Sequence, residues 1–203
     1  MGKHIVFMLA VVGAVLVSVW VLAGAGREKF RQGYYIDANN NRVEGFIYFN
    51  ENNYDHFYFR LGTGGRAARI GVAVSNGFGF DNRNFVVLED VHWQTSLWRN
   101  YARRAFAELL VDGRVKLYRV LSEANQLHPI TGKAGAIQVV SNYLLRREGD
   151  YTYLALSEKR QPFRQQLSEY LKDNPAISEQ ILKSDSSVFD LTGVITAYNK
   201  GGQ

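Results

Sequence analysis

The segment Val91–Arg104 concentrates side chains of the kinds that bind ligands. It holds two tryptophans, one tyrosine and three arginines. Aromatic rings and guanidinium groups together can form a surface for sugars, peptidoglycan or lipid headgroups. The alternative, which we favour, is that the tryptophans are core residues and the arginines are their solvated rim. The candidate binding-surface residues are Trp93, Trp98, Arg99, Tyr101, Arg103 and Arg104.

The motif Asp37-x-Asn39-x-Asn41 begins like a calcium loop, in which oxygen ligands at alternate positions wrap the ion. It then departs from that pattern, because Arg42 stands where the loop needs glycine and Tyr48 stands where it needs a bidentate glutamate. We therefore expect a hairpin turn built of turn-forming residues, and no metal site.

The motif Gly62-x-Gly64-x-x-Ala67 matches a relaxed dinucleotide fingerprint. A nucleotide site would need a helix after the glycines, whereas residues 69–74 read as a strand. We expect a flexible glycine loop and no cofactor.

Catalytic patterns do not emerge from the remaining residues. The four histidines, at positions 4, 56, 92 and 128, include no pair at the i, i+4 spacing of a zinc site. The chain has no cysteine, which excludes disulfides, thiol catalysis and Cys-ligated metals. The sequence assigns no catalytic, cofactor-binding or metal-binding residue.

An uncharged apolar run, Ile5–Leu22, follows Lys3 near the N-terminus. As a helix, 18 residues span about 27 Å, close to the thickness of a bilayer core and longer than the apolar stretch of most cleaved signals. Cleavage near Ala25 is the alternative, because residues 23–25 are small. We expect residues 1–26 to be a signal peptide or a signal anchor that directs the chain to a membrane.

Orientation in the membrane is less clearly encoded. Arg27, Lys29 and Arg31 follow the apolar run, and this excess of basic residues favours a cytoplasmic C-terminal body. The aromatic, cysteine-free body favours the opposite side. We expect an envelope location, either anchored in the inner membrane or periplasmic or secreted after cleavage.

The body, residues 27–203, is expected to be a single β-rich domain of the α+β class. Residues 34–36 and 43–49 predict a first hairpin, residues 54–61 a further strand, and residues 137–146 and 151–156 a later pair, with residues 127–135 as the loop before it. Asp112-Gly113 between two strands predicts a hairpin with a type I′ turn, in which both residues have positive φ.

After Ser157 the apolar period changes from two to about 3.6. The pattern predicts three short helices within residues 161–199, packed on an antiparallel sheet. The first runs over residues 163–171 and ends at Asn174-Pro175. The third is opened by Ser187, with Asp190 three residues later as in a capping box.

The body is only mildly basic. Without residues 1–26 it keeps 23 Lys and Arg against 19 Asp and Glu, a net charge of +4, with both signs interspersed. This pattern is typical of a solvated surface, so we expect no nucleic-acid partner. Attraction to an anionic lipid surface remains open.

The order of these features resembles a loose group of uncharacterised exported proteins of Bacteroidota-type bacteria. The matching stretches are residues 33–36 with 43–47, residues 111–118, and the helical ending from Leu167 to Asn199. The resemblance implies an export signal, a β-rich body and a helical tail. It implies an envelope location and no activity.

We therefore expect a non-catalytic binding or structural module of the envelope, held by residues 5–22 in a membrane and binding an envelope protein, glycan or lipid. The alternative is an envelope hydrolase acting on glycan or lipid, with catalytic groups assembled from separate strands. A concave pocket that gathers carboxylates or histidines would favour the enzyme, and a filled interior would favour the binding module.

Overall fold

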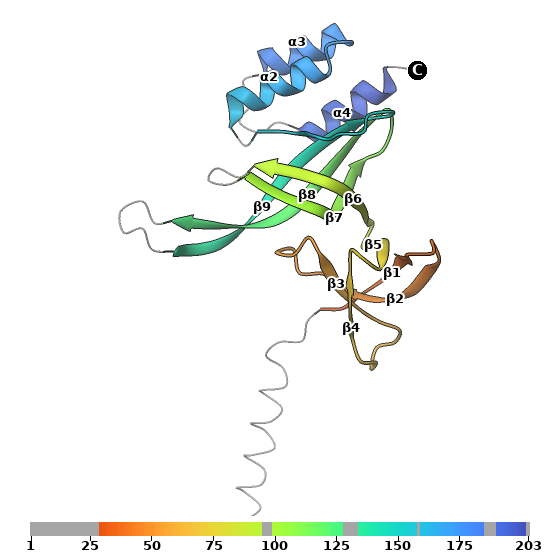
Figure 1. Cartoon of the computed structure of the whole chain (residues 1–203). Coiled ribbons are helices and arrows are strands. Elements are labelled where there is room, and N and C mark those ends of the chain that lie inside the picture. Colours follow the sequence, from red (N-terminus) through yellow and green to blue (C-terminus); the bar gives the residue numbers. More distant parts are fainter. Residues whose placement is uncertain (1–28, 95–98, 128–133, 158, 185–189, 202–203) are drawn as a thin grey trace, which may run out of the picture. The chain divides into compact units, whose positions relative to one another are not determined.

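The computed structural model describes residues 29–94, 99–127, 134–157, 159–184 and 190–201. The strands and helices below all belong to one compact unit, Arg31–Gln203 (Figure 1). The strands are β1 (Arg31–Asp37), β2 (Arg42–Tyr48), β3 (His56–Arg60), β4 (Ala68–Gly71), β5 (Ser75–Phe80), β6 (Arg83–Gln94), β7 (Arg99–Val111), β8 (Val115–Leu127), β9 (Ala134–Arg147) and β10 (Leu154–Ala155). The helices are α2 (Arg160–Tyr170), α3 (Pro175–Lys183) and α4 (Leu191–Lys200).

The strands form one curled antiparallel sheet in the order β10-β9-β8-β7-β6-β5-β1-β2-β3-β4. Strands β1–β4 and strands β5–β10 are two successive meanders, and the pairing of β1 with β5 joins them. The β7–β8 ladder covers only residues 108–111 of β7, and beyond it β6–β7 and β8–β9 continue as two separate hairpins (Figure 1).

Phenylalanine side chains from both meanders form one interior cluster. The cluster consists of Ile47, Phe57, Phe59, Phe78, Phe80, Phe85 and Phe106. The rings of Phe78 and Phe85 stack at 4.5 Å, and Phe106 meets Phe78 edge-on at 5.0 Å. The amide of Phe106 on β7 donates to the carbonyl of Tyr54, just before β3, at 2.7 Å. This hydrogen bond joins β7 directly to the segment before β3.

A second cluster lies on the opposite face of β7. Phe106 belongs to the phenylalanine cluster, whereas its neighbours Ala105 and Ala107 belong to a cluster with Val120 and Leu144. The alternation follows because successive strand residues point to opposite faces. The sheet therefore has buried side chains on both faces along this strand.

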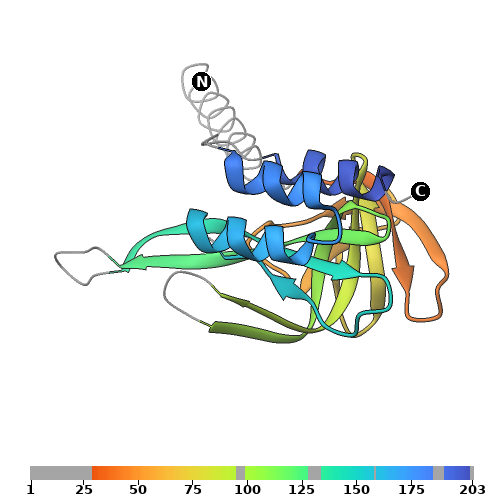
Figure 2. The same ribbon diagram turned by 90° about the horizontal axis from the view of Figure 1, so that it is seen from above.

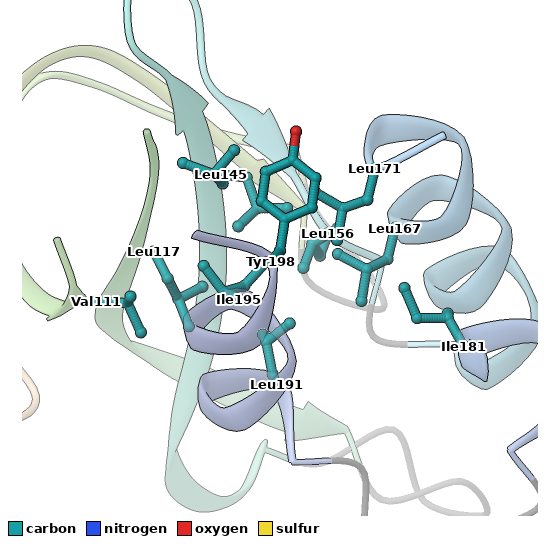
Figure 3. Close-up of a cluster of buried hydrophobic side chains, with 11 residues drawn as sticks. Val111, Leu117, Leu145, Leu156, Leu167, Leu171, Ile181, Leu191, Ile195 and Tyr198 are labelled. Atoms are coloured by element: carbon teal, nitrogen blue, oxygen red, sulfur yellow. The ribbon is translucent and has the colours of Figure 1, made fainter. Parts of the chain in front are cut away.

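The helices cover a third cluster at the β7–β9 end of the sheet. Figure 2 shows the helices alongside the long strands β8 and β9, and Figure 3 shows the side chains between them. Leu167 of α2, Leu171 directly after that helix, Ile181 of α3 and Ile195 of α4 are fully buried there. They pack with Val111, Val115, Leu117, Leu145, Leu156, Leu191 and Tyr198. The predicted β-rich body with three packed C-terminal helices is thus confirmed.

The first predicted hairpin is also confirmed, since β1 pairs with β2. Asp37 Oδ1 accepts hydrogen bonds from the amides of Asn39 and Asn41, both at 2.8 Å. The carboxylate therefore closes the turn through backbone donors, as an Asx-type turn does. The glycine motif lies between strands β3 and β4, as expected for a loop.

The predicted turn type at Asp112-Gly113 is wrong, although the hairpin is present. Gly113 has a φ of +147° but Asp112 does not have a positive φ, so the turn is not type I′. Two consecutive positive-φ residues occur instead at Asp81 (+49°) and Asn82 (+61°), between β5 and β6. Asp and Asn tolerate this conformation better than other non-glycine residues, which makes that turn possible without glycine.

Two further predictions need revision. The third helix begins at Leu191, and its N-cap is Asp190, whose side chain accepts from the Gly193 amide at 2.9 Å. Ser187, predicted to open it, lies outside the described residues. α2 ends at Tyr170, before the predicted stop at Asn174-Pro175. These two residues instead begin α3, because the Asn174 side chain accepts from the Ile177 amide and Pro175 is the first residue of the helix. The predicted loop 127–135 overlaps the described ends of β8 and β9 by one or two residues at each side.

The apolar run at residues 5–22 lies outside the described residues, so its predicted insertion stays a prediction. Among the helices that the structure describes, none is both long and apolar enough to cross a bilayer.

Candidate functional site

The segment Val91–Arg104 lies on the β6–β7 hairpin. Trp93 is 4% exposed and packs edge-on against Tyr54, with ring centroids 5.2 Å apart. Trp93 therefore has the core role that we favoured from the sequence. Trp98 and the side chain of Arg99 lie outside the described residues.

Tyr101, another member of this candidate surface, faces away from Trp93. Trp93 pairs with Asn100 across the hairpin, and the next pair is His92 with Tyr101, so Tyr101 and Trp93 point to opposite faces. Tyr101 is 54% exposed, stacks at 4.7 Å on His92, and donates to Asp90 at 2.8 Å. This hydrogen bond raises the pKa of Tyr101. The tyrosine is thus tied to its own hairpin.

The two arginines of this segment whose side chains the structure describes differ in their surroundings. Arg103 is exposed, whereas Arg104 is partly buried and lies 3.6 Å from the Glu89 carboxylate. Among the members whose side chains the structure describes, Tyr101 and Arg103 are exposed, whereas Trp93 is buried and Arg104 is partly buried.

A denser set of aromatic and cationic side chains lies on the outward face of β1–β4. The inward positions of these strands, among them Tyr35, Ile47, Phe57, Phe59 and Ile70, pack in or against the phenylalanine cluster. The alternate positions therefore point outward. We call this the arginine–tyrosine face, formed by Tyr34, Arg42, Glu44, Phe46, Tyr48, His56, Tyr58, Arg60 and Arg69.

Tyr34 and Arg42 form one end of this face. The Arg42 guanidinium lies 3.4 Å from the centroid of the Tyr34 ring and donates to Glu44 at 2.6 Å. A Cβ atom on Gly79 would lie 2.8 Å from that ring, so only glycine lets the tyrosine approach the sheet this closely. The hydrogen bond to Glu44 raises the pKa of Arg42. The guanidinium is held flat and charged.

Two cross-strand rows continue the face. In one row Phe46 pairs with Arg60, whose guanidinium lies 5.8 Å from the phenylalanine ring. In the other row Tyr58 stands between Tyr48 and Arg69. The rings of Tyr48 and Tyr58 are 6.0 Å apart. Each row thus places one arginine next to an aromatic residue.

Acidic groups balance only part of this charge. Asp55 lies 3.5 Å from Arg69 and also contacts His56. Glu44 is the other carboxylate, paired with Arg42. The β3–β4 loop adds an exposed arginine, Arg66, and an exposed leucine, Leu61, whose exposed fraction is 77%.

The sequence predictions did not include this face, although its pattern is present in the sequence. In residues 42–48 and 56–60 the inward and outward positions differ clearly in residue type. Ile and Phe occupy inward positions, and Arg, Tyr and His occupy outward positions. An amphipathic strand usually alternates apolar with simply polar residues. An outward set rich in Tyr and Arg is the feature that marks a recognition surface.

The most buried carboxylate, Glu108, is engaged by two arginines. It accepts from Arg83 at 2.9 and 3.0 Å and from Arg119 at 3.1 Å. Burial acts to raise the pKa of Glu108, but the hydrogen bonds from the arginines outweigh it and the net pKa is lowered. Glu108 is therefore an ionised structural group and is a poor proton donor.

Over the residues that the structure describes, no three His, Asp or Glu side chains converge as metal ligands would. Comparisons of the chain with models of protein families, with curated proteins and with solved structures find no match. The arginine–tyrosine face therefore stands on its own geometry as the candidate site.

Proposed function

We propose that this chain is a non-catalytic binding module of the cell envelope, anchored by residues 5–22, whose arginine–tyrosine face binds an anionic envelope component. The observation that carries the proposal is that Arg42, Arg60 and Arg69 lie beside aromatic residues on the outward face of β1–β4. Guanidinium groups held against rings lose less side-chain freedom on binding, and they offer forked donors to phosphate or carboxylate groups.

The filled interior supports a binding module over the alternative, an envelope hydrolase. Apolar side chains fill both clusters of the sheet, and one of these clusters consists chiefly of phenylalanine. His56 on β3 contacts Asp55, whereas His92 on β6 stacks on Tyr101. The two described histidines thus have separate neighbours and do not converge on a carboxylate in a concave site.

The envelope location rests on the sequence. An uncharged run of 18 residues, Ile5–Leu22, has the length of a retained anchor. The resemblance to exported β-rich proteins with a helical tail agrees with that location. We place the body on the non-cytoplasmic side, although the basic residues that follow the apolar run favour the opposite orientation.

Fractionation with N-terminal sequencing tests the location. We expect the full chain in the inner-membrane fraction, resistant to carbonate, with its N-terminal apolar run intact. An active phosphatase fused after Gln203 would agree with a non-cytoplasmic body. A mature chain that starts near Gly26, or a fusion that is active only when its reporter is cytoplasmic, would contradict the anchor or the orientation respectively.

Binding of polyphosphate, a soluble polyanion, tests the face independently of location. We expect the full chain in neutral detergent to bind it through Arg42, Arg66 and Arg69, and the triple Arg→Gln variant to bind at least about tenfold more weakly. The matched control removes three exposed lysines of the helices, as Lys172→Gln, Lys183→Gln and Lys200→Gln. Equal loss in both triple variants would mean that net charge alone, and not this face, governs binding.

A further inference from the structure

We propose that the arginine–tyrosine face, together with the β3–β4 loop, docks on the anionic surface of the membrane that holds residues 5–22. The inference rests on the proposed anchor and names the anionic component as lipid headgroups. It is carried by three observations: the charge of the face, an exposed leucine beside that charge, and the short chain between the apolar run and β1.

The first observation is the excess of positive charge. The face and its loop carry Arg42, Arg60, Arg66 and Arg69 against the carboxylates of Glu44 and Asp55. The side chains of Arg42 and Arg69 are 54% and 57% exposed. Each basic residue near an anionic leaflet favours attachment by roughly fivefold. The face and its loop therefore carry two more arginines than carboxylates, which favours anionic over zwitterionic lipid.

The second observation separates lipid from a dissolved polyanion. Leu61 is 77% exposed and follows Arg60 directly, and Arg66 lies in the same loop. The loop turns back on Arg60, since a Cβ on Gly65 would lie 3.9 Å from the Arg60 Cβ. An exposed apolar side chain between arginines and next to tyrosines is typical of a contact at the headgroup boundary, where apolar atoms enter and charges stay at the surface.

The third observation is reach. Eight residues, 23–30, separate Leu22 from Arg31, the first residue of β1. Fully extended, they span at most about 30 Å. Of the described strands, β1 is therefore the one that follows the apolar run most closely in the sequence. Tethering raises the local concentration of headgroups, so weak contacts suffice for docking.

Quenching by brominated lipid tests the docking. The chain has no cysteine, so Thr63→Cys places a single bimane label in the β3–β4 loop, and Tyr151→Cys places one on an exposed turn far along the sheet. The full-length proteins are reconstituted in nanodiscs of brominated phosphatidylcholine, alone or with about one third phosphatidylglycerol. We expect quenching of the Thr63 label in anionic discs, weaker quenching in zwitterionic discs, and little quenching of the Tyr151 label in either.

Matched variants identify the groups responsible. Arg42→Gln, Arg66→Gln and Arg69→Gln together should shift the docked population on the order of 100-fold toward the free state, and added salt should do the same. The triple Lys→Gln variant of the helices should leave quenching unchanged. Leu61→Ser should reduce quenching without altering the urea midpoint, which separates insertion from folding.

The outcomes distinguish docking from anchoring. Protein that stays in the discs while both labels remain equally unquenched would overturn the docking and leave the anchor intact. Protein that fails to enter the discs would overturn the anchor, and with it docking by a tethered face. Loss of quenching at the Thr63 label combined with arginine-dependent binding of polyphosphate would assign the face to a soluble polyanion and overturn the lipid inference.

Discussion

The side-chain amide of Asn199, near the end of α4, pairs with both backbone polar groups of Val115, at the start of β8. Its Oδ1 accepts from the Val115 amide at 2.9 Å, and its Nδ2 donates to the Val115 carbonyl at 2.8 Å. Beside the β7–β8 turn, the asparagine side chain thus makes the two hydrogen bonds that the backbone of a neighbouring strand would make. It joins the last helix to the sheet through directional bonds in addition to the apolar contacts of Ile195 and Tyr198.

Replacing Asn199 by Ala should destabilise the fold. Both polar groups of Val115 lose their partner, and Val115 itself is fully buried, so we expect a loss of about 1–3 kcal/mol in the free energy of unfolding. Urea unfolding measures it. Asn199→Asp keeps the acceptor and loses the donor. Its free energy of unfolding should lie between those of the parent and Asn199→Ala. An Ala variant as stable as the parent would show that water replaces the amide at no cost.

Gly113 should tolerate substitution less well than Gly149. Both have positive φ, at +147° and +89°, but a Cβ on Gly113 would lie 2.5 Å from Asn199 Nδ2, whereas Gly149 has open space. We expect Gly113→Val to cost on the order of 1–3 kcal/mol and Gly113→Ala to cost more than Gly149→Ala. Thermal melts compare them. Adding Asn199→Ala should remove part of the Gly113→Ala penalty; strictly additive losses would contradict the clash.

Trp93 should behave as a core residue. Truncation to Ala creates a cavity beside Tyr54 and should cost about 3–5 kcal/mol. Arg103→Ala, at an exposed position of the same hairpin, should change stability by no more than about 0.5 kcal/mol. Melting curves of the two variants decide the matter. A stable Trp93→Ala protein that loses a partner would restore this segment as a binding surface.

Asp173 should make stability depend on pH on the acid side. Hydrogen bonds from Arg147 and Tyr198 hold the pKa of Asp173 well below its usual range. A carboxylate with a lowered folded pKa stabilises the fold above its unfolded pKa, about 3.9, and loses that contribution as the pH falls further. The melting-temperature gap between the parent and Asp173→Asn should therefore be constant from pH 7 to about 5 and shrink toward pH 2.

Tyr198→Phe serves as the control for this titration. It removes the hydroxyl that donates to Asp173 at 2.6 Å and leaves the Arg147 contact at 3.0 Å. The acid-side loss of stability should become smaller but persist. If the gap between the parent and Asp173→Asn is the same at pH 3 and pH 6, the ion pair does not contribute to the fold.

Local elements followed from the sequence because their signals are local. The apolar period of the C-terminal region located three helices, and the turn-formers at 37–41 located the first hairpin. The Asp112-Gly113 hairpin was found for the same reason. Its turn type was not, because Asn199, distant in sequence, contacts the glycine and bonds to Val115.

The arginine–tyrosine face depends on tertiary structure. Nothing in residues 91–104 taken in order separates a buried tryptophan from an exposed one, and only the curl of the sheet brings Tyr54 onto Trp93. The arginine–tyrosine face likewise needs the register that sets Phe46 beside Arg60 and Tyr58 beside Arg69. Strand alternation fixes which residues share a face within one strand, but pairing across strands decides which of them become neighbours. The sequence alone therefore determined the elements and the apolar N-terminal run, and the tertiary structure decided where cations and rings meet.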